Sequence, residues 1–205
     1  MSWFDRLVVG TLPIVPRAVV QRVAKRYVAG AALGDALDKM RRLAARGAMA
    51  TVDLLGEEVD RAEVAESNVA EYTRVLDAID AEKLDANISV KLTAFGLDVG
   101  EDFCLGQLSR VLAHARAHGN FVRIDMEDHT RTDATLRIYQ QARREFDNVG
   151  VVLQAMLFRT EDDIELLEGD DYKRSGGNAR LCKGIYKEPE EIAHTTFDAI
   201  REAFV

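Results

Sequence analysis

The sequence predicts an α/β fold of the (β/α)8 TIM-barrel type, truncated to about five strand–helix units behind an N-terminal helical segment. Five short apolar runs alternate with longer segments of helical spacing. This alternation indicates parallel strands joined by right-handed crossovers. Polar residues of neighbouring runs also share one face, as they do inside a barrel whose outer face packs on helices.

Composition narrows the classes of protein. The chain has 205 residues, of which 47% are hydrophobic and 30% charged, as in one globular domain with a substantial core. A formal charge of -8 and a pI near 5.1 disfavour binding to nucleic acid, which depends on clustered Lys and Arg. Cys104 and Cys182 lie outside any zinc-binding or CxxC spacing, so we expect a reduced, cytoplasmic protein.

Residues 1–46 are expected to form the helical segment, since apolar residues recur at helical spacing between Val19 and Ala45. The apolar run Leu7–Val15 is too short to span a bilayer and is interrupted by Pro13. We interpret it as neither a signal peptide nor a membrane span. The stretch Trp3–Val20 is expected to pack as a peripheral helical element or to lie on the inner face of the membrane.

Residues 47–205 are expected to form the partial barrel. Its strands are predicted at Ala48–Leu55, Asn87–Leu92, Phe121–Met126, Val149–Leu157 and Ala179–Tyr186. Crossover helices are predicted at Glu57–Ala81, Asp98–His118 and Thr132–Phe146. Helical character returns in Ala193–Val205.

Two architectures share this order of elements, the barrel and the doubly wound sheet. Neither GxGxxG nor GxxxxGK[ST] occurs in the chain, so the sequence supports no Rossmann dinucleotide site or P-loop. In the third run, Arg123, Asp125 and Glu127 alternate with apolar residues that include Met126. A barrel places such charged residues inside, toward the carboxyl ends of its strands, and we therefore favour the barrel.

Several of these polar residues are candidates for chemistry. Lys91 lies in an apolar strand and needs an anion, which a ligand carboxylate or a salt bridge to Asp125 or Asp53 would supply equally well. Asp125 begins an acidic strand end that would accept a substrate N–H, orient a neighbour or, least favoured, hold a metal. No histidine spacing indicates a metal site, and His114 and His118 are expected to be solvated.

The last two strands add an amide and two cations. Gln154 suits the edge of a heterocyclic ring, and a structural amide is an equal alternative. Arg180 and Lys183 would stabilise negative charge on a reduced cofactor or hold a phosphate. Because their spacing places them on opposite faces of a regular strand, one of them is expected at a strand end. A surface ion pair would account for either residue alone.

Six segments carry a resemblance to a known family. From Arg26 to Glu191 the chain resembles the proline dehydrogenases, with matching motifs in the same order and at similar spacing. These motifs are Lys25–Gly30, Val52–Glu57, Ser89–Leu97, Arg123–Asp128, Val151–Ala155 and Arg180–Pro189.

The resemblance implies oxidation of L-proline to 1-pyrroline-5-carboxylate, with hydride passing to N5 of FAD and electrons to a membrane quinone. It implies that Asp125 and Arg180 are catalytic and that Lys91 pairs with the proline carboxylate. Tyr186 would pack beside the substrate. The residues implied to contact FAD are Met126, Gln154, Lys183, Gly184 and Ile185.

The chain also departs from the family. Five strands are expected here, whereas a complete barrel has eight. The family's last three strands and its C-terminal helix, with the arginines that clamp the proline carboxylate, have no counterpart. We therefore expect little turnover of proline by this chain alone, and aggregation, homo-oligomers or dependence on a complementing fragment.

Two other functions stay open. One is a non-catalytic remnant that associates through open sheet edges. The other is an unrelated barrel that binds a phosphorylated ligand through Arg180 and Lys183.

A first prediction concerns the N-terminal stretch. If Trp3–Val20 lies on a membrane, deletion of residues 1–20 should lower the fraction of protein that sediments with lipid vesicles. The full chain is the control, compared at equal protein and lipid concentrations. Equal sedimentation of the two proteins would contradict membrane attachment through this stretch.

Overall fold

The computed structural model describes residues 28–30, 32–56, 58–167 and 177–205. The chain divides into two compact units, Met1–Ala48 and Met49–Val205. The described part of the first unit contains helix α3 (Leu33–Ala44), where the carboxylate of Asp35 accepts a hydrogen bond from the backbone N–H of Ala32. Trp3–Val20 and the beginning of the predicted helical segment lie outside the described residues.

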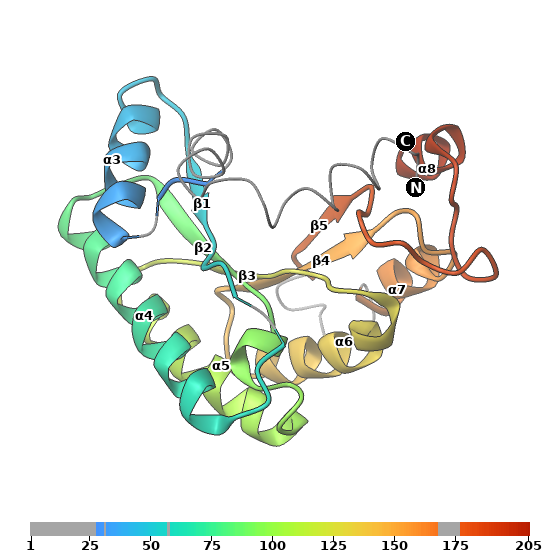
Figure 1. Cartoon of the computed structure of the whole chain (residues 1–205), viewed down its shortest axis with the longest axis horizontal. Coiled ribbons are helices and arrows are strands. Elements are labelled where there is room, and N and C mark those ends of the chain that lie inside the picture. The colour runs from blue at the N-terminus through green and yellow to red at the C-terminus, as the bar shows by residue number, and fades with distance from the viewer. Residues whose placement is uncertain (1–27, 31, 57, 168–176) are drawn as a thin grey trace, which may run out of the picture. The chain divides into compact units, whose positions relative to one another are not determined.

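The second unit is built on one parallel sheet of five strands in the order β1-β2-β3-β4-β5 (Figure 1). Each strand pairs with its neighbours in the sequence, so the order does not reverse as it does in a doubly wound sheet. The five strands form a curled half of an α/β barrel, and the predicted fold class is confirmed. The strands are β1 (Ala50–Val52), β2 (Ala86–Val90), β3 (Val122–Ile124), β4 (Val149–Gln154) and β5 (Ala179–Cys182).

A helix follows each strand. Helices α4, α5 and α6 run side by side along one side of the sheet (Figure 1), and α4 contacts β2 while α6 contacts β4. The helices are α4 (Ala62–Ala81), α5 (Glu101–Ala117), α6 (His129–Arg143), α7 (Thr160–Leu167) and α8 (Phe197–Phe204), and a short 3-10 helix η2 (Thr93–Phe95) precedes α5. Among the described residues, no helix is long and apolar enough to cross a membrane.

The face of the sheet toward these helices is apolar, as strand alternation predicts. Its side chains are at most 2% exposed, and sealing each one from water contributes about 1.5 to 3 kcal/mol. They are Ile88, Val90, Val122, Ile124, Val151 and Leu153. Polar side chains are thereby confined to the opposite face and to the loops at the strand ends.

The predicted strands extend past the observed ones at their carboxyl ends. β2 ends at Val90, β3 at Ile124 and β5 at Cys182. Lys91, Asp125 and Lys183 therefore stand in the strand-to-helix loops, the part of a barrel that holds active sites.

The polar face carries a cation that crosses strands. Arg123 of β3 is paired in register with Gly150 of β4. Its guanidinium passes over that glycine and donates to the side-chain oxygen of Asn178 at 2.8 Å and to its backbone oxygen at 3.3 Å. A Cβ at position 150 would lie 2.2 Å from Nη1 of Arg123 and 2.8 Å from the backbone oxygen of Asn178. The absence of a side chain at Gly150 leaves the space for this crossing.

Gly150→Ala should therefore destabilise the sheet. Overpacking against the Asn178 backbone is expected to lower the free energy of unfolding by about 1 to 3 kcal/mol. The control is Gly106→Ala in α5, where nothing lies within 4 Å of the added Cβ. That change should raise stability by about 0.5 to 1 kcal/mol, because alanine favours a helix interior over glycine. Urea unfolding of both variants measures the difference, and equal shifts would contradict the steric argument.

Candidate active site

A pocket of about 320 Å³ opens at the carboxyl ends of β3, β4 and β5. It is lined by Asp125, Met126, Val152, Gln154, Arg180, Cys182, Lys183, Gly184, Ile185 and Tyr186. These include every site residue predicted from the sequence except Lys91. The volume lies at the lower end of the range for small-molecule sites.

An ion pair spans the pocket from the loop after β3 to β5. Nη2 of Arg180 donates to Oδ1 of Asp125 at 2.7 Å, and Arg180 is paired in register with Val152 of the intervening strand. The two side chains are 42% and 21% exposed. Because ion pairs in contact with water are weak, a ligand that offers better partners can displace this one.

Positive charge exceeds negative charge around the pocket. Burial and the nearby charge of Arg180 lower the pKa of Arg123, while Asp125 acts in the opposite direction. Lys183 also lines the pocket, and its ammonium lies 5.0 Å from the ring centre of Phe197 and 5.7 Å from that of Phe204, both in α8. These cation–π contacts hold the ammonium in place without neutralising it. The pocket is therefore suited to a ligand that carries negative charge.

Gln154 makes the structural hydrogen bond that was one of the two interpretations of its amide. The side chain is 3% exposed, and its Nε2 donates to the backbone oxygen of Glu127 at 2.8 Å. The residue also lines the pocket. The structural hydrogen bond thus orients an amide at the wall of the pocket.

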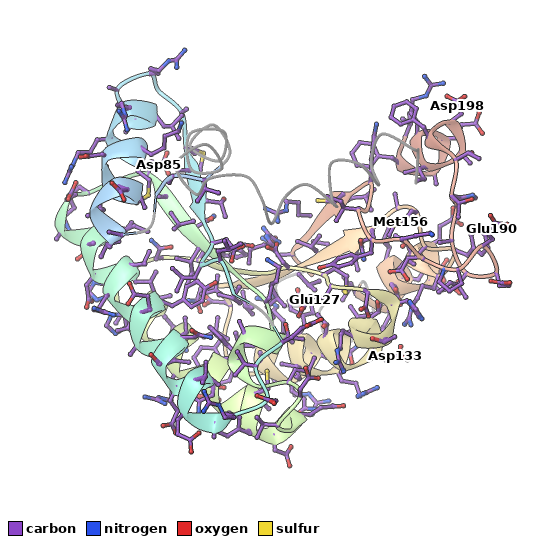
Figure 2. The ribbon with its side chains drawn as sticks, in the orientation of Figure 1. Asp85, Glu127, Asp133, Met156, Glu190 and Asp198 are labelled. Carbon is purple, nitrogen blue, oxygen red and sulfur yellow. The ribbon has the colours of Figure 1, made fainter. Side chains whose placement is uncertain are left out.

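Strand alternation predicts the wrong side of the sheet for two residues that follow β3, Met126 and Glu127. It places Glu127 with Arg123 and Asp125, but the carboxylate of Glu127 (Figure 2) accepts hydrogen bonds from the backbone N–H of Thr93 at 3.1 Å and from its hydroxyl. Alternation also assigns Met126 to the helix-facing side, whereas it lines the pocket together with Asp125. The strand ends at Ile124, and the two-residue period ends with it.

Lys91 is held by a salt bridge. Its Nζ lies 3.0 Å from Oδ2 of Asp53, one of the two protein partners considered from the sequence. The hydroxyl of Tyr72 donates to the other oxygen of Asp53 at 3.0 Å and accepts from the backbone N–H of Leu54. Burial, followed by the charge of Asp53 and a smaller effect of Asp125, raises the pKa of Tyr72 above its usual value. Lys91 thus belongs to an adjoining cluster in which Tyr72 stays protonated.

The loop after β5 is fixed at both ends. Gly184 has a φ of +102°, and a Cβ there would lie 2.3 Å from Sδ of Met156 (Figure 2). Further along, the buried carboxylate of Glu188 accepts from the backbone N–H of His129 at 2.9 Å and contacts the imidazole of that residue. The backbone N–H of Met156, in the loop after β4, donates to the backbone oxygen of Lys183 at 3.0 Å. The segment that carries Lys183 and Tyr186 is thereby attached to the loop after β4 on one side and to α6 on the other.

Sequence reasoning missed two residues of the pocket, Val152 and Cys182. Val152 pairs in register with Arg180, and Cys182 with Gln154. Val152 shares a face of β4 with Gln154, and Cys182 shares a face of β5 with Arg180, so the two-residue period of each strand was the signal that would have found them.

Fold and site together define the class: an α/β-barrel protein with a mixed-charge pocket at the carboxyl ends of its strands. Residues 36–198 match the family model described as Proline dehydrogenase. The chain therefore belongs to the proline dehydrogenase family.

Individual relatives agree. The chain is similar to proline dehydrogenase 1 of Bacillus subtilis (strain 168), with 38% identity over 170 residues, which cover 83% of this chain and 55% of that protein. Proline dehydrogenase of Deinococcus radiodurans is 33% identical over 183 residues, covering 87% and 57% respectively. The chain thus spans about half the length of the curated relatives it matches.

A solved structure shows the same fold. Proline utilization A from Bdellovibrio bacteriovorus, inactivated by N-propargylglycine, superposes with a TM-score of 0.70 at 24% identity. The match covers 80% of this chain and 20% of that one.

The two cysteines provide a test of the fold, because Cys104 is buried and Cys182 lines the pocket. Burial, followed by the charges of Glu127 and Glu101, raises the pKa of the Cys104 thiol to about 12. Because Cys104 is buried and its thiol is hard to ionise, alkylation at about pH 8 should be confined to Cys182 in the folded protein. Mass spectrometry after iodoacetamide treatment should find one modified thiol per chain, and none in Cys182→Ser. Rapid labelling of Cys104 before unfolding would contradict its buried placement.

Proposed function

We propose that this chain provides the flavin-binding and substrate-binding strands of an enzyme that oxidises L-proline to 1-pyrroline-5-carboxylate with FAD as cofactor. Membership of the proline dehydrogenase family supports the proposal. The observation that carries it is the placement of Arg180, Asp125 and Lys183 around one pocket at the carboxyl ends of the strands.

The residues of the pocket suit a flavin. Arg180 and Lys183 supply the positive charge that favours a reduced, anionic ring, and Gln154 supplies an amide at the wall. Met126 and Ile185 offer apolar surface, and Ile185 is 91% exposed, as suits a side chain that packs against a ligand. When bound, FAD would supply the hydride acceptor, and the protein would supply orientation and electrostatics.

L-proline carries a carboxylate and a ring nitrogen, and the site offers a partner of opposite character for each. Within the pocket, Arg180 is suited to the carboxylate, and Lys91 would approach it from the adjoining cluster by exchanging Asp53 for the substrate. The carboxylate of Asp125 can accept a hydrogen bond from the ring nitrogen. Asp125 also orients Arg180 in the absence of ligand. Tyr186 lines the same pocket and would pack beside the ring of the substrate.

The proposal extends to the electron acceptor. We propose that a membrane quinone receives the electrons and that the protein works at the inner face of the membrane. The resemblance of the six strand motifs to the proline dehydrogenases supports this step.

A second candidate function, binding of a phosphorylated ligand, is favoured by one observation: Arg180 and Lys183 both line the pocket. Asp125 counts against it, because a carboxylate 2.7 Å from Arg180 would repel a phosphate dianion. Proline oxidation is therefore preferred.

The proposal predicts that one substitution lowers the rate of proline oxidation and that another weakens the binding of FAD. FAD binding is measured by quenching of flavin fluorescence on the 205-residue chain. Proline-dependent dye reduction is measured on that chain and on the same chain extended by the C-terminal part of the Bacillus subtilis relative. Arg180→Gln should lower the rate constant of the extended protein about 10²- to 10³-fold, as expected when a group that stabilises developing charge is removed. Lys183→Gln should weaken FAD binding.

The matched control is Arg137→Gln, which removes an arginine of similar exposure that pairs with Glu101 on the outer helices. It should leave FAD affinity and rate unchanged. Absence of FAD binding in the parent chain, or an undiminished rate in Arg180→Gln, would overturn the proposal. Saturable binding of inorganic phosphate without any response to proline would favour the second candidate.

A further inference from the structure

Two histidines and a carboxylate converge on the outer surface, away from the pocket. His114 lies in the last turn of α5 and His118 directly follows that helix. Asp77 lies in α4, which runs beside α5 (Figure 1). Oδ1 of Asp77 lies 2.7 Å from Nε2 of His114 and 3.4 Å from Nε2 of His118. The imidazole side chains are 30% and 27% exposed, so they are less solvated than the sequence suggested.

The ligand atoms have the spacing of a small coordination sphere. One atom from each of the three residues lies within 4.8 Å of the others. In a tetrahedral zinc site with bonds of about 2.0 to 2.1 Å, ligand atoms lie about 3.3 Å apart. The two distances from Oδ1 of Asp77 to the imidazole nitrogens, 2.7 and 3.4 Å, lie on either side of this value. Rotation of the partly exposed side chains is sufficient to make the two distances equal.

A second carboxylate orients one of the imidazoles. Oδ2 of Asp80 lies 3.1 Å from Nδ1 of His118, and Oδ1 of Asp80 accepts from Nζ of Lys83 at 2.8 Å. When Nδ1–H donates to Asp80, the lone pair of His118 is left on Nε2, the atom that faces Asp77. A carboxylate that binds the far nitrogen of a histidine is the usual support of a zinc-binding imidazole.

We propose that Asp77, His114 and His118 form a binding site for Zn²⁺ that joins α4 to α5, with Asp80 as the residue that positions His118. Two imidazoles and one carboxylate are donors that zinc accepts, and the fourth position is open to water. The site is distinct from the pocket: of the residues that line the pocket, none belongs to it. Its effect is structural, because the metal crosslinks residues 37 positions apart in the sequence.

Isothermal titration of the untagged 205-residue chain with ZnCl₂ tests the proposal, in a weakly coordinating buffer at about pH 7.5, where free imidazole is mostly neutral. We expect saturation at one Zn²⁺ per chain and a thermal unfolding midpoint that rises with zinc concentration. His118→Asn and Asp77→Asn should each weaken binding at least tenfold. Asp80→Asn should weaken it about 10- to 100-fold, the effect typical of a residue that orients a metal ligand.

His194→Asn is the matched control, because this histidine packs against the ring of Phe158 outside the cluster. Its zinc affinity should equal that of the parent chain. Circular dichroism verifies that each variant is folded. Co²⁺ used in place of Zn²⁺ gives a spectroscopic reading, because a tetrahedral Co²⁺ centre absorbs visible light. Absence of saturable binding in the parent chain would overturn the site. So would unchanged zinc affinity in the double variant His114→Asn/His118→Asn.

Discussion

The structure of the second unit depends on the sealing of one face of its sheet. Helices α4 to α6 cover that face, and its side chains are nearly excluded from water. A polar group placed there would lose its hydration without a partner, so polar side chains are restricted to the other face and to the loops. The curled parallel sheet then brings the loops of β3, β4 and β5 together around a single pocket. The chemistry of the pocket is therefore a consequence of how the sheet is covered.

Much of this arrangement was predictable because strands have a period of two. Parity predicted that Gln154 faces the interior from β4, whereas the placement of Arg180 at the site came from family resemblance and the register of β4 against β5 shows it on the same face. The sequential order of strands follows from the alternation of strands with helices. Parity failed at Glu127 and Met126, which follow the end of β3. Loop residues take directions set by tertiary hydrogen bonds, such as the one from Thr93 to Glu127, and no local pattern encodes these.

The partner of Lys91 illustrates a different limit. Burial of an ammonium in an apolar strand predicts that an anion lies nearby, but Asp53 is 38 residues away in the sequence. Choosing between Asp53, Asp125 and a ligand required the register of β1 against β2 and the position of Tyr72. The identities of Met126, Lys183, Gly184, Ile185 and Tyr186 as site residues came from family resemblance, because each stands beyond a strand end, where periodicity gives no information.

The packing of Gly184 against Met156 links the dimensions of the pocket to a residue that does not line it. The segment after β5 approaches the loop after β4 only as closely as the thioether of Met156 permits. A shorter side chain at position 156 would let the segment settle inward and narrow the pocket, and a branched one would displace it outward. A substitution at Met156 would therefore change the size of the pocket while leaving every charged group that lines it in place.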